Sequence, residues 1–294
     1  MFIKRSMNLP FKIRILIVAT LAILSSTLSA QDKKEPEKKP PPKPRPVAIF
    51  EDKNLENAVR KQVFEKRDNK TPLYANDVQH VSAIMGKGME IKSLKGIEHC
   101  KELASLELPG NSITDISQLK GLSRLQLIDL SENNITDTSP LKNLGILQYL
   151  NLENNQLTDV TPLGNIPSLR SLYLTHNQLT DITPLAKLTK LWSLYLGENE
   201  LTDITPLKNI PHIDILDIRN NKLTDITPIA GHKSFRMLFL QSNQLRNLGP
   251  LLDTVKKDAV EKREYSTFLR IWTNGNPLPK GQIAELKKHV KEVQ

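Results

Sequence analysis

The chain has 294 residues, of which 38% are hydrophobic and 25% charged, enough for one extended domain or two compact ones. Its formal net charge of +9 is concentrated at the start, because four cations precede residue 15 and residues 31–46 add a net charge of about +3. The rest of the chain, 47–294, is near +2, so its charge does not indicate nucleic-acid binding.

Residues 1–30 have the pattern of a secretory signal peptide. A basic start is followed by the apolar run 15–24 and then by small polar residues ending at Ala30. The apolar run is shorter than the ~20 residues of a membrane span, which favours a cleaved signal over the alternative of an uncleaved anchor. We therefore expect an exported protein, secreted or located in the periplasm or cell envelope, with no integral membrane domain after cleavage.

Residues 31–46 contain six prolines among alternating charges, a composition that buries little apolar surface. We expect an extended, solvated linker, and the alternative is a segment whose lysines contact a wall or membrane. Residues 47–102 then predict a helical cap and a degenerate first repeat. Leu55 and Val59 share a helical face after Asp52, a suitable N-cap, and Met89 stands where later units have asparagine.

Residues 103–251 contain seven units with a constant period of 22 residues. Three apolar phases recur, represented in the first unit by Leu103, Leu106 and Leu108. The asparagines that follow are Asn111, Asn133, Asn155, Asn177, Asn199, Asn221 and Asn243. This is the L-x-x-L-x-L-x-x-N pattern of leucine-rich repeats. Cys100, the only cysteine, stands at the apolar phase of Leu122, so we expect a buried thiol and no intramolecular disulfide.

Each phase of the unit has a physical role. The L-x-L segment alternates with period two and predicts a short parallel strand with its leucines inward. The asparagine amide is expected to satisfy backbone groups of adjacent coils at the turn. In Leu-Thr-Asp-Ile-Thr-Pro-Leu, intact at 179–185 and 201–207, Thr183 and Thr205 are expected to cap a short helix that begins at proline. The repeated aspartates are expected to brace the turn through local backbone bonds.

Residues 252–294 predict a helical insert, a degenerate last repeat and a capping helix. The insert places Leu252 and Val255 on one helical side, and Phe268 and Ile271 then stand at repeat phases. The amphipathic spacing from Ile283 to Val293 predicts a terminal helix.

The repeat unit, with Ser93-Leu94-Lys95-Gly96-Ile97-Glu98 before it, resembles the bacterial internalin class of leucine-rich repeats. The resemblance covers about residues 49–251. It implies an α/β solenoid, a right-handed superhelix with a concave parallel sheet, a convex side of short 3-10 or helical turns, and helical caps at both ends. It also implies protein recognition by the concave face, without identifying a ligand.

Function must lie on outward strand positions, because packing occupies the inward ones. The tyrosines should form a near-continuous aromatic ridge along strands ~4.8 Å apart, with Arg236 beside it and Glu107, Asp129 and Glu132 making its N-terminal part acidic. The candidate ligand-binding residues are Tyr149, Tyr173, Tyr195, Asp217, Arg219, Met237, Phe239 and Trp272. Clustered aromatics with arginine are typical of protein recognition, and the alternative is mutual cross-strand packing. Trp192 fits either a rim contact or packing.

We predict no enzyme activity, cofactor or metal. The six histidines lack metal-ligand spacing, and no nucleophile motif or phosphate-binding loop is present. The repeated aspartates lack the oxygen-rich partners of a calcium site. We therefore expect a monomer that binds a protein ligand. The alternatives are a carbohydrate or envelope polymer stacked on the tyrosines, or a purely structural spacer. Binding to a protein should be lost on charge reversal at Asp217 or Arg219 and be competed by salt, whereas binding to a sugar should be weak, competed by free glycans and insensitive to salt.

Overall fold

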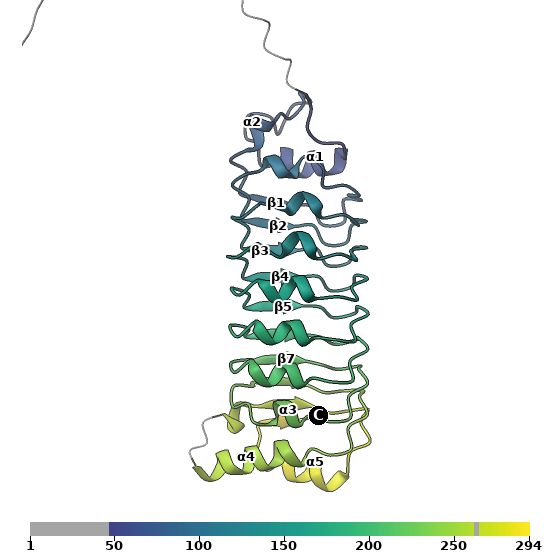
Figure 1. Ribbon diagram of the computed structural model, residues 1–294, viewed down its shortest axis with the longest axis vertical. Coiled ribbons are helices and arrows are strands. Elements are labelled where there is room, and N and C mark those ends of the chain that lie inside the picture. Colours follow the sequence, from purple (N-terminus) through teal and green to yellow (C-terminus); the bar gives the residue numbers. More distant parts are fainter. Residues whose placement is uncertain (1–46, 262–264) are drawn as a thin grey trace, which may run out of the picture. The chain divides into compact units, whose positions relative to one another are not determined.

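The computed structural model describes residues 47–261 and 265–294, so the predicted signal peptide and linker lie outside the described residues. These residues form a stack of coils, each giving one strand to a single sheet (Figure 1). The strands pair in chain order, all in parallel, which confirms the predicted α/β solenoid. They are β1 (Ala83–Met85), β2 (Ser105–Glu107), β3 (Leu127–Asp129), β4 (Tyr149–Asn151), β5 (Ser171–Tyr173), β6 (Ser193–Tyr195), β7 (Ile215–Asp217), β8 (Met237–Phe239), β9 (Arg270–Trp272) and β10 (Glu292–Val293).

The register places equivalent residues of successive units side by side. In β5 and β6, for example, Leu172 pairs with Leu194 and both side chains are fully buried. The two flanking residues of each strand point away from this core, as the period-two pattern requires. One continuous hydrophobic core therefore runs along the stack, and one face of the sheet stays open to solvent.

The buried asparagines join neighbouring coils. Asn199 donates from Nδ2 to the carbonyl oxygens of Leu174 (3.0 Å) and Leu196 (3.1 Å), and its Oδ1 accepts from the N–H of Leu179 (3.0 Å). Asn276 repeats the pattern in the last full coil. The predicted role of the asparagine is thus confirmed, and each amide satisfies backbone groups that stacking would otherwise bury unpaired.

The repeated aspartates brace the turn as predicted, but they also take over the capping role assigned to threonine. Asp181 Oδ1 accepts from the N–H of Thr183 at 2.7 Å, and the equivalent bond recurs at Asp115, Asp137, Asp159, Asp203 and Asp225. Thr183 is itself the first residue of its 3-10 helix and Ile182 is the N-cap. The prediction that threonine caps the helix was wrong, because the free N–H at the start of the helix belongs to Thr183 and donates to the carboxylate of Asp181.

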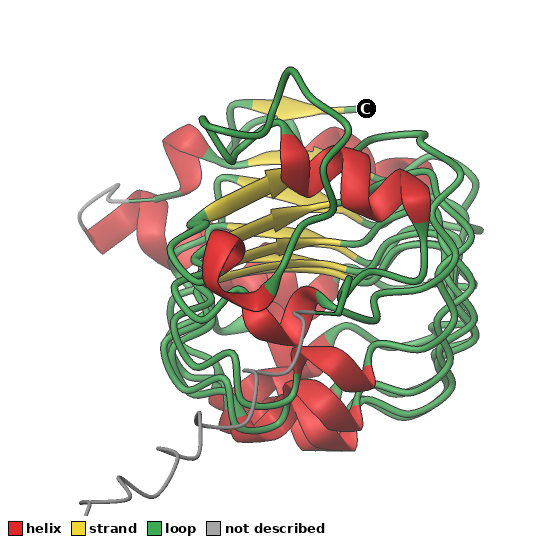
Figure 2. Ribbon diagram, turned by 90° about the horizontal axis from the view of Figure 1, so that it is seen from above, coloured by secondary structure: helices red, strands yellow, loops and turns green. Residues whose placement is uncertain are grey.

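Short helical turns form the side of the stack opposite the strands, as Figure 2 shows along the stack axis. They are η1 (Ile97–His99), η2 (Ser117–Leu119), η3 (Ser139–Leu141), η4 (Thr161–Asn165), η5 (Thr183–Lys187), η6 (Thr205–Asn209) and α3 (Thr227–Ala230), whereas η7 (Ser266–Phe268) stands directly before β9 and is not one of this series. Each buries an apolar residue against the core, such as Leu185 in η5. Short 3-10 turns fit a 22-residue unit because little chain remains for a longer helix.

The N-terminal end of the core is covered by α1 (Lys53–Arg60) and α2 (Ala75–Val78). Asp52 caps α1 as predicted, since its Oδ1 accepts from the N–H groups of Asn54 (2.8 Å) and Leu55 (3.1 Å). Its Oδ2 accepts from Lys92 N–H at 2.7 Å, so one carboxylate also fixes the cap to the first coil. Met89, in place of asparagine, packs against the core.

At the C-terminal end, α4 (Gly249–Glu261) and α5 (Lys280–Leu286) lie against each other and cover the last coils (Figure 1). Two details differ from the sequence interpretation. The terminal helix ends at Leu286, and Val293 lies in the edge strand β10. Phe268 is 59% exposed, whereas Leu269 is fully buried in the core. The longer connection before β9 shifts the inward position by one residue, a change that the period alone does not reveal.

Cys100 is fully buried, as its phase predicted. Burial, with a smaller contribution from the negative charge of Glu98, raises the pKa of its thiol to about 12. The side chain therefore packs as a small apolar group. Among the described residues, no helix has both the length and the apolar composition to cross a bilayer.

Candidate functional site

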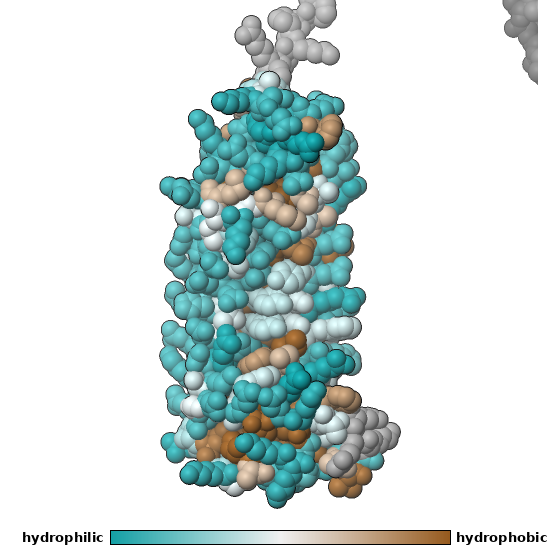
Figure 3. Space-filling view, turned by 180° about the vertical axis from the view of Figure 1, so that it is seen from behind, coloured by the Kyte–Doolittle hydropathy of each residue, from teal (hydrophilic) through white to brown (hydrophobic). Residues whose placement is uncertain are grey.

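The open face of the sheet, called the sheet face below, consists of the outward strand residues and the turn residues that follow each strand. It is the face that is concave in the predicted fold. Figure 3 shows the molecule from the side opposite to Figure 1, where pale and brown residues run along the middle of a mostly hydrophilic surface. The candidate ligand-binding residues lie on the consecutive strands β4 to β9, except Arg219, which lies in the turn after β7.

Tyr149, Tyr173 and Tyr195 form a stack, called the tyrosine ladder below. The ring centroids of Tyr149 and Tyr173 are 5.2 Å apart with planes tilted by 42°, and those of Tyr173 and Tyr195 are 4.4 Å apart with planes at 9°. Each ring is half-buried. Burial, followed by neighbouring charges, raises the pKa of Tyr149 to about 12, so its hydroxyl remains a neutral hydrogen-bonding group.

A second aromatic contact lies further along the sheet face. The rings of Phe239 and Trp272 stack with centroids 4.3 Å apart and planes at 13°. Trp272 Nε1 donates to Gln294 Oε1 at 2.7 Å, which fixes the indole, and Met237 lies half-buried at the start of β8. The predicted near-continuous ridge is therefore two aromatic groups, the tyrosine ladder and the Phe239–Trp272 pair.

Asp217 separates the two aromatic groups. It pairs in register with Tyr195 on one side and Phe239 on the other. Its side chain is only 2% exposed, although its strand position points outward. Asp217 Oδ1 accepts from Arg219 N–H at 3.0 Å, and its Oδ2 lies 3.5 Å from Arg219 Nε. Burial raises the pKa of Asp217, against the opposing effect of these contacts. The prediction of Asp217 as an exposed contact was wrong.

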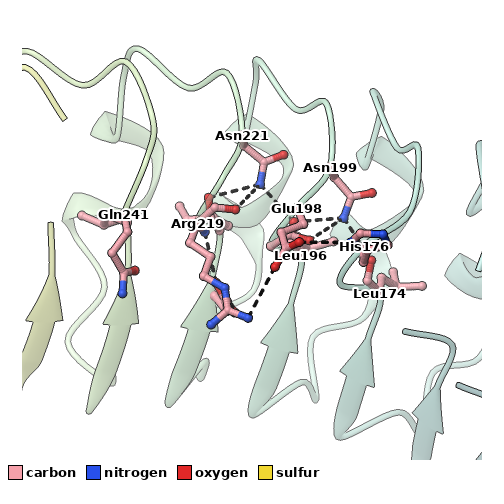
Figure 4. Close-up of polar contacts among 12 residues, drawn as sticks. Leu174, His176, Leu196, Glu198, Asn199, Arg219, Asn221 and Gln241 are labelled. Carbon is pink, nitrogen blue, oxygen red and sulfur yellow. Dashed lines mark hydrogen bonds and ion pairs between the residues drawn. The ribbon is translucent and has the colours of Figure 1, made fainter. Parts of the chain in front are cut away.

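Arg219 belongs to a chain of polar contacts across three coils (Figure 4). Its Nη2 lies 3.9 Å from Glu198 Oε1, and Glu198 Oε2 lies 3.0 Å from His176 Nδ1. Arg219 therefore remains partly exposed but has two carboxylate partners within the protein. Arg236, predicted beside the aromatic residues, instead extends along the strand edge, where its Nε lies 3.3 Å from Asp214 Oδ1.

The acidic part of the sheet face extends further than the sequence analysis recognised. Glu107 and Asp129 accept hydrogen bonds from the hydroxyls of Ser105 (3.0 Å) and Ser131 (2.7 Å). Glu153, which was not among the candidate residues, is half-buried on the coil of β4. The pKa of Glu153 is raised, mainly by burial. The charge of Arg219 opposes this, and the charges of Glu198, Glu132 and Asp129 raise the pKa further. The signal was available in the sequence, because Glu153 follows β4 at the phase that Arg219 occupies after β7.

Trp192 lies outside the sheet face, at the edge of β6. It is 56% exposed, and the guanidinium of Arg170 lies 5.8 Å from its ring centroid. A hollow of about 660 Å³ between α5 and β10, lined by Leu278 and Ile283, lies beyond the last aromatic residue. Within the parts of the chain that the structure describes, no three His, Cys, Asp or Glu side chains gather closely enough to hold a metal ion.

Comparisons with known proteins agree with this architecture. Models of the leucine-rich-repeat families match residues 101–157, 147–187 and 189–231. Internalin C2 of Listeria monocytogenes is 34% identical, covering 72% of this chain and 94% of its own, with a TM-score of 0.68. A leucine-rich-repeat protein of Leptospira interrogans, 21% identical over 68% of this chain and 57% of its own, shares the fold with a TM-score of 0.59.

The plant peptide hormone receptor RGFR1, in complex with RGF2, is 25% identical over 68% of this chain and 36% of its own, with a TM-score of 0.52. No curated protein matches the sequence. The ten-stranded parallel sheet and the repeat matches define a leucine-rich-repeat protein. The identity with internalin C2, over nearly all of that protein, shows that the chain belongs to the bacterial internalin-type leucine-rich-repeat family.

Proposed function

We propose that this chain is an exported, non-catalytic binding protein that recognises a protein ligand through its sheet face. The observation that carries the proposal is the tyrosine ladder on an uncovered parallel sheet. Parallel sheets are normally covered on both faces, so an open face lined with aromatic side chains is a surface suited to a partner. Export rests on the signal-like pattern of residues 1–30.

The geometry of the ladder favours a protein over the alternative ligand, a carbohydrate or envelope polymer. Sugars stack on the open faces of aromatic rings. Tyr173 stacks on Tyr195 at 4.4 Å and is tilted against Tyr149 at 5.2 Å, so little of either face of its ring is open to a sugar. Such rigid, amphipathic rings provide contact area at low entropic cost, as in many protein-binding surfaces.

The absence of catalysis is proposed because the polar groups of the sheet face are used within the fold. Asp217, Arg219, Glu198 and His176 bind one another. The similar plant protein is a peptide hormone receptor, which supports a binding role for this fold without indicating the same ligand. The candidate contacts at the sheet face are Tyr149, Tyr173, Tyr195, Arg219, Met237, Phe239 and Trp272.

The test is a differential pull-down from envelope and extracellular fractions with the chain and its Tyr173→Ala/Tyr195→Ala variant. A matched control is Phe64→Ala, which removes an aromatic ring that is 76% exposed in the N-terminal cap. Circular dichroism must first show that all three proteins are folded. We expect a protein retained by the parent and the control but lost with the double variant. Retention of the same proteins by all three would refute the assignment of the site.

A further inference from the structure

The sheet face differs in charge from the chain as a whole. Residues 47–294 together carry a formal net charge of about +2. Across the five coils of β2 to β6, however, the residues from each strand to the turn after it include no lysine or arginine. They carry five carboxylates, Glu107, Asp129, Glu132, Glu153 and Glu198. The tyrosine ladder thus lies on a surface that is negatively charged while the protein around it is not.

These carboxylates differ in how far the protein itself compensates them. Glu198 lies near Arg219 and His176, while Glu107 and Asp129 accept from serine hydroxyls. Within residues 47–261 and 265–294, the side chains of Glu132 and Glu153 have no ion pair or hydrogen bond, although the charge of Arg219 acts on Glu153 from further away.

Glu132 and Glu153 are also neighbours on adjacent coils. The N–H of Glu132 donates to the carbonyl oxygen of Glu153 at 2.9 Å. Glu153 follows the strand that carries Tyr149, so the pair lies beside the start of the tyrosine ladder. The pKa of Glu153 is raised in this arrangement, because burial and the charges of Glu198, Glu132 and Asp129 disfavour the ionised form and outweigh the opposing charge of Arg219.

A partner that covers this surface removes water from both carboxylates, and burying a charge without a counter-charge is costly. A cation supplied by the partner removes that cost and adds attraction at close range. An acidic partner, a nucleic acid or an anionic membrane would be repelled instead.

We propose that the sheet face binds a protein segment that presents lysine or arginine side chains to Glu132 and Glu153 while its apolar residues pack along the tyrosine ladder. This inference rests on the proposed function and specifies the chemistry of the partner. Glu198 does not take part as a free charge, because Arg219 and His176 occupy it.

The experiment is a selection of random displayed peptides on the immobilised full chain, followed by affinity measurements of the selected peptides. We expect peptides enriched in lysine or arginine together with apolar residues, with affinity that falls as salt rises. Glu132→Gln/Glu153→Gln should weaken their binding about tenfold at low salt. The charge-matched control Glu65→Gln/Asp253→Asn changes two exposed carboxylates outside the sheet face and should leave binding unchanged.

The outcomes separate this inference from the proposed function. Peptides that are lost with Tyr173→Ala/Tyr195→Ala but show no excess of basic residues would overturn the basic partner and leave sheet-face recognition standing. Basic peptides that bind the parent and Glu132→Gln/Glu153→Gln with equal affinity would likewise overturn the basic partner and leave sheet-face recognition standing. A sheet face that retains no peptide, or retains peptides equally after the tyrosines are removed, would overturn both.

Discussion

Gly197 leaves the space into which the side chain of Asp217 fits. A Cβ atom placed on Gly197 would lie 3.0 Å from Asp217 Oδ1 and 3.1 Å from Arg219 Cγ, closer than such contacts normally are. Other coils carry a side chain at this phase, such as Thr175 and Glu153. The single missing side chain therefore allows the buried Asp217 carboxylate and its contact with Arg219, which divide the two aromatic groups.

We predict that Gly197→Ala lowers the free energy of unfolding by about 1–2 kcal/mol, because Asp217 or Arg219 must move to admit the methyl group. Urea unfolding followed by circular dichroism measures the change. Gly145→Ala is the matched control, since a Cβ there meets no atom within 4 Å. Equal stability of the two variants would contradict this account of Gly197.

Charge reversal at Asp217 should lower the stability of the fold, so a loss of binding would not by itself show that Asp217 contacts a ligand. The carboxylate is 2% exposed and lies 3.5 Å from Arg219 Nε, so Asp217→Lys places two cations together in a buried site. We expect the free energy of unfolding to fall by about 3 kcal/mol or more, measured by urea unfolding. Glu107→Lys, at the same strand position but half-buried, is the comparison and should cost much less. A stable Asp217→Lys variant would show that the site is more open than the structure indicates.

The buried asparagines should contribute far more to the free energy of unfolding than exposed asparagines do. Asn199→Ala removes bonds to Leu174, Leu196 and Leu179 and leaves their backbone groups buried without partners. We expect a loss of about 2–4 kcal/mol in the free energy of unfolding. Asn209→Ala, an exposed position in η6, should change it by less than about 0.5 kcal/mol. Thermal or urea unfolding distinguishes the two, and similar losses would contradict the assigned role.

His232 should make the fold less stable in mild acid. Burial lowers its pKa below the ordinary value of 6.5, so the unfolded chain binds a proton more readily than the folded chain. The free energy of unfolding should therefore fall as pH drops through 6.5, and the fall should level off below the folded-state pKa. Urea unfolding at pH 7.5 and pH 5.5 gives the difference.

His232→Leu should reduce this acid-induced loss, whereas the exposed His212→Leu should leave it unchanged. Asp217 and Glu153, whose pKa values are raised, act in the opposite direction, but they are present in all three proteins. An equal loss in parent and His232→Leu would exclude His232 as its source.

The thiol of Cys100 should be unreactive in the folded protein. It is fully buried, and its pKa is raised to about 12, so almost no thiolate forms at pH 8. Titration with a disulfide reagent should give no fast reaction in buffer and complete reaction in urea. Fast modification of the folded chain would show that the first coil opens readily.

The sequence was sufficient to predict the strands and the asparagine bonds, because a strict period fixes which residues face inward. It was less informative where side-chain length matters. Alternation placed Asp217 outward, but the short carboxylate is covered by its neighbours and by Arg219, while the longer tyrosines remain half-exposed. The alternation also could not show that Glu198 is paired and that Glu153 is not.

The ends of the stack were predicted less well for a related reason. Once the period is broken after Leu251, the spacing of apolar residues fits more than one structure. Val293 continues a helical spacing yet lies in β10, where it pairs with Ile271 of β9. A strand at that point continues the sheet by one more pairing, and the tertiary contact outweighs the local pattern.

The asparagine bonds connect each coil only to its immediate neighbours, with the same atoms at every step. Removing or duplicating one complete unit between Asn155 and Asn199 would therefore leave each remaining junction with its usual partners. The sheet face can consequently lengthen or shorten by one strand at a time during evolution. Such a change would alter how many tyrosines adjoin the acidic coils without requiring a new core.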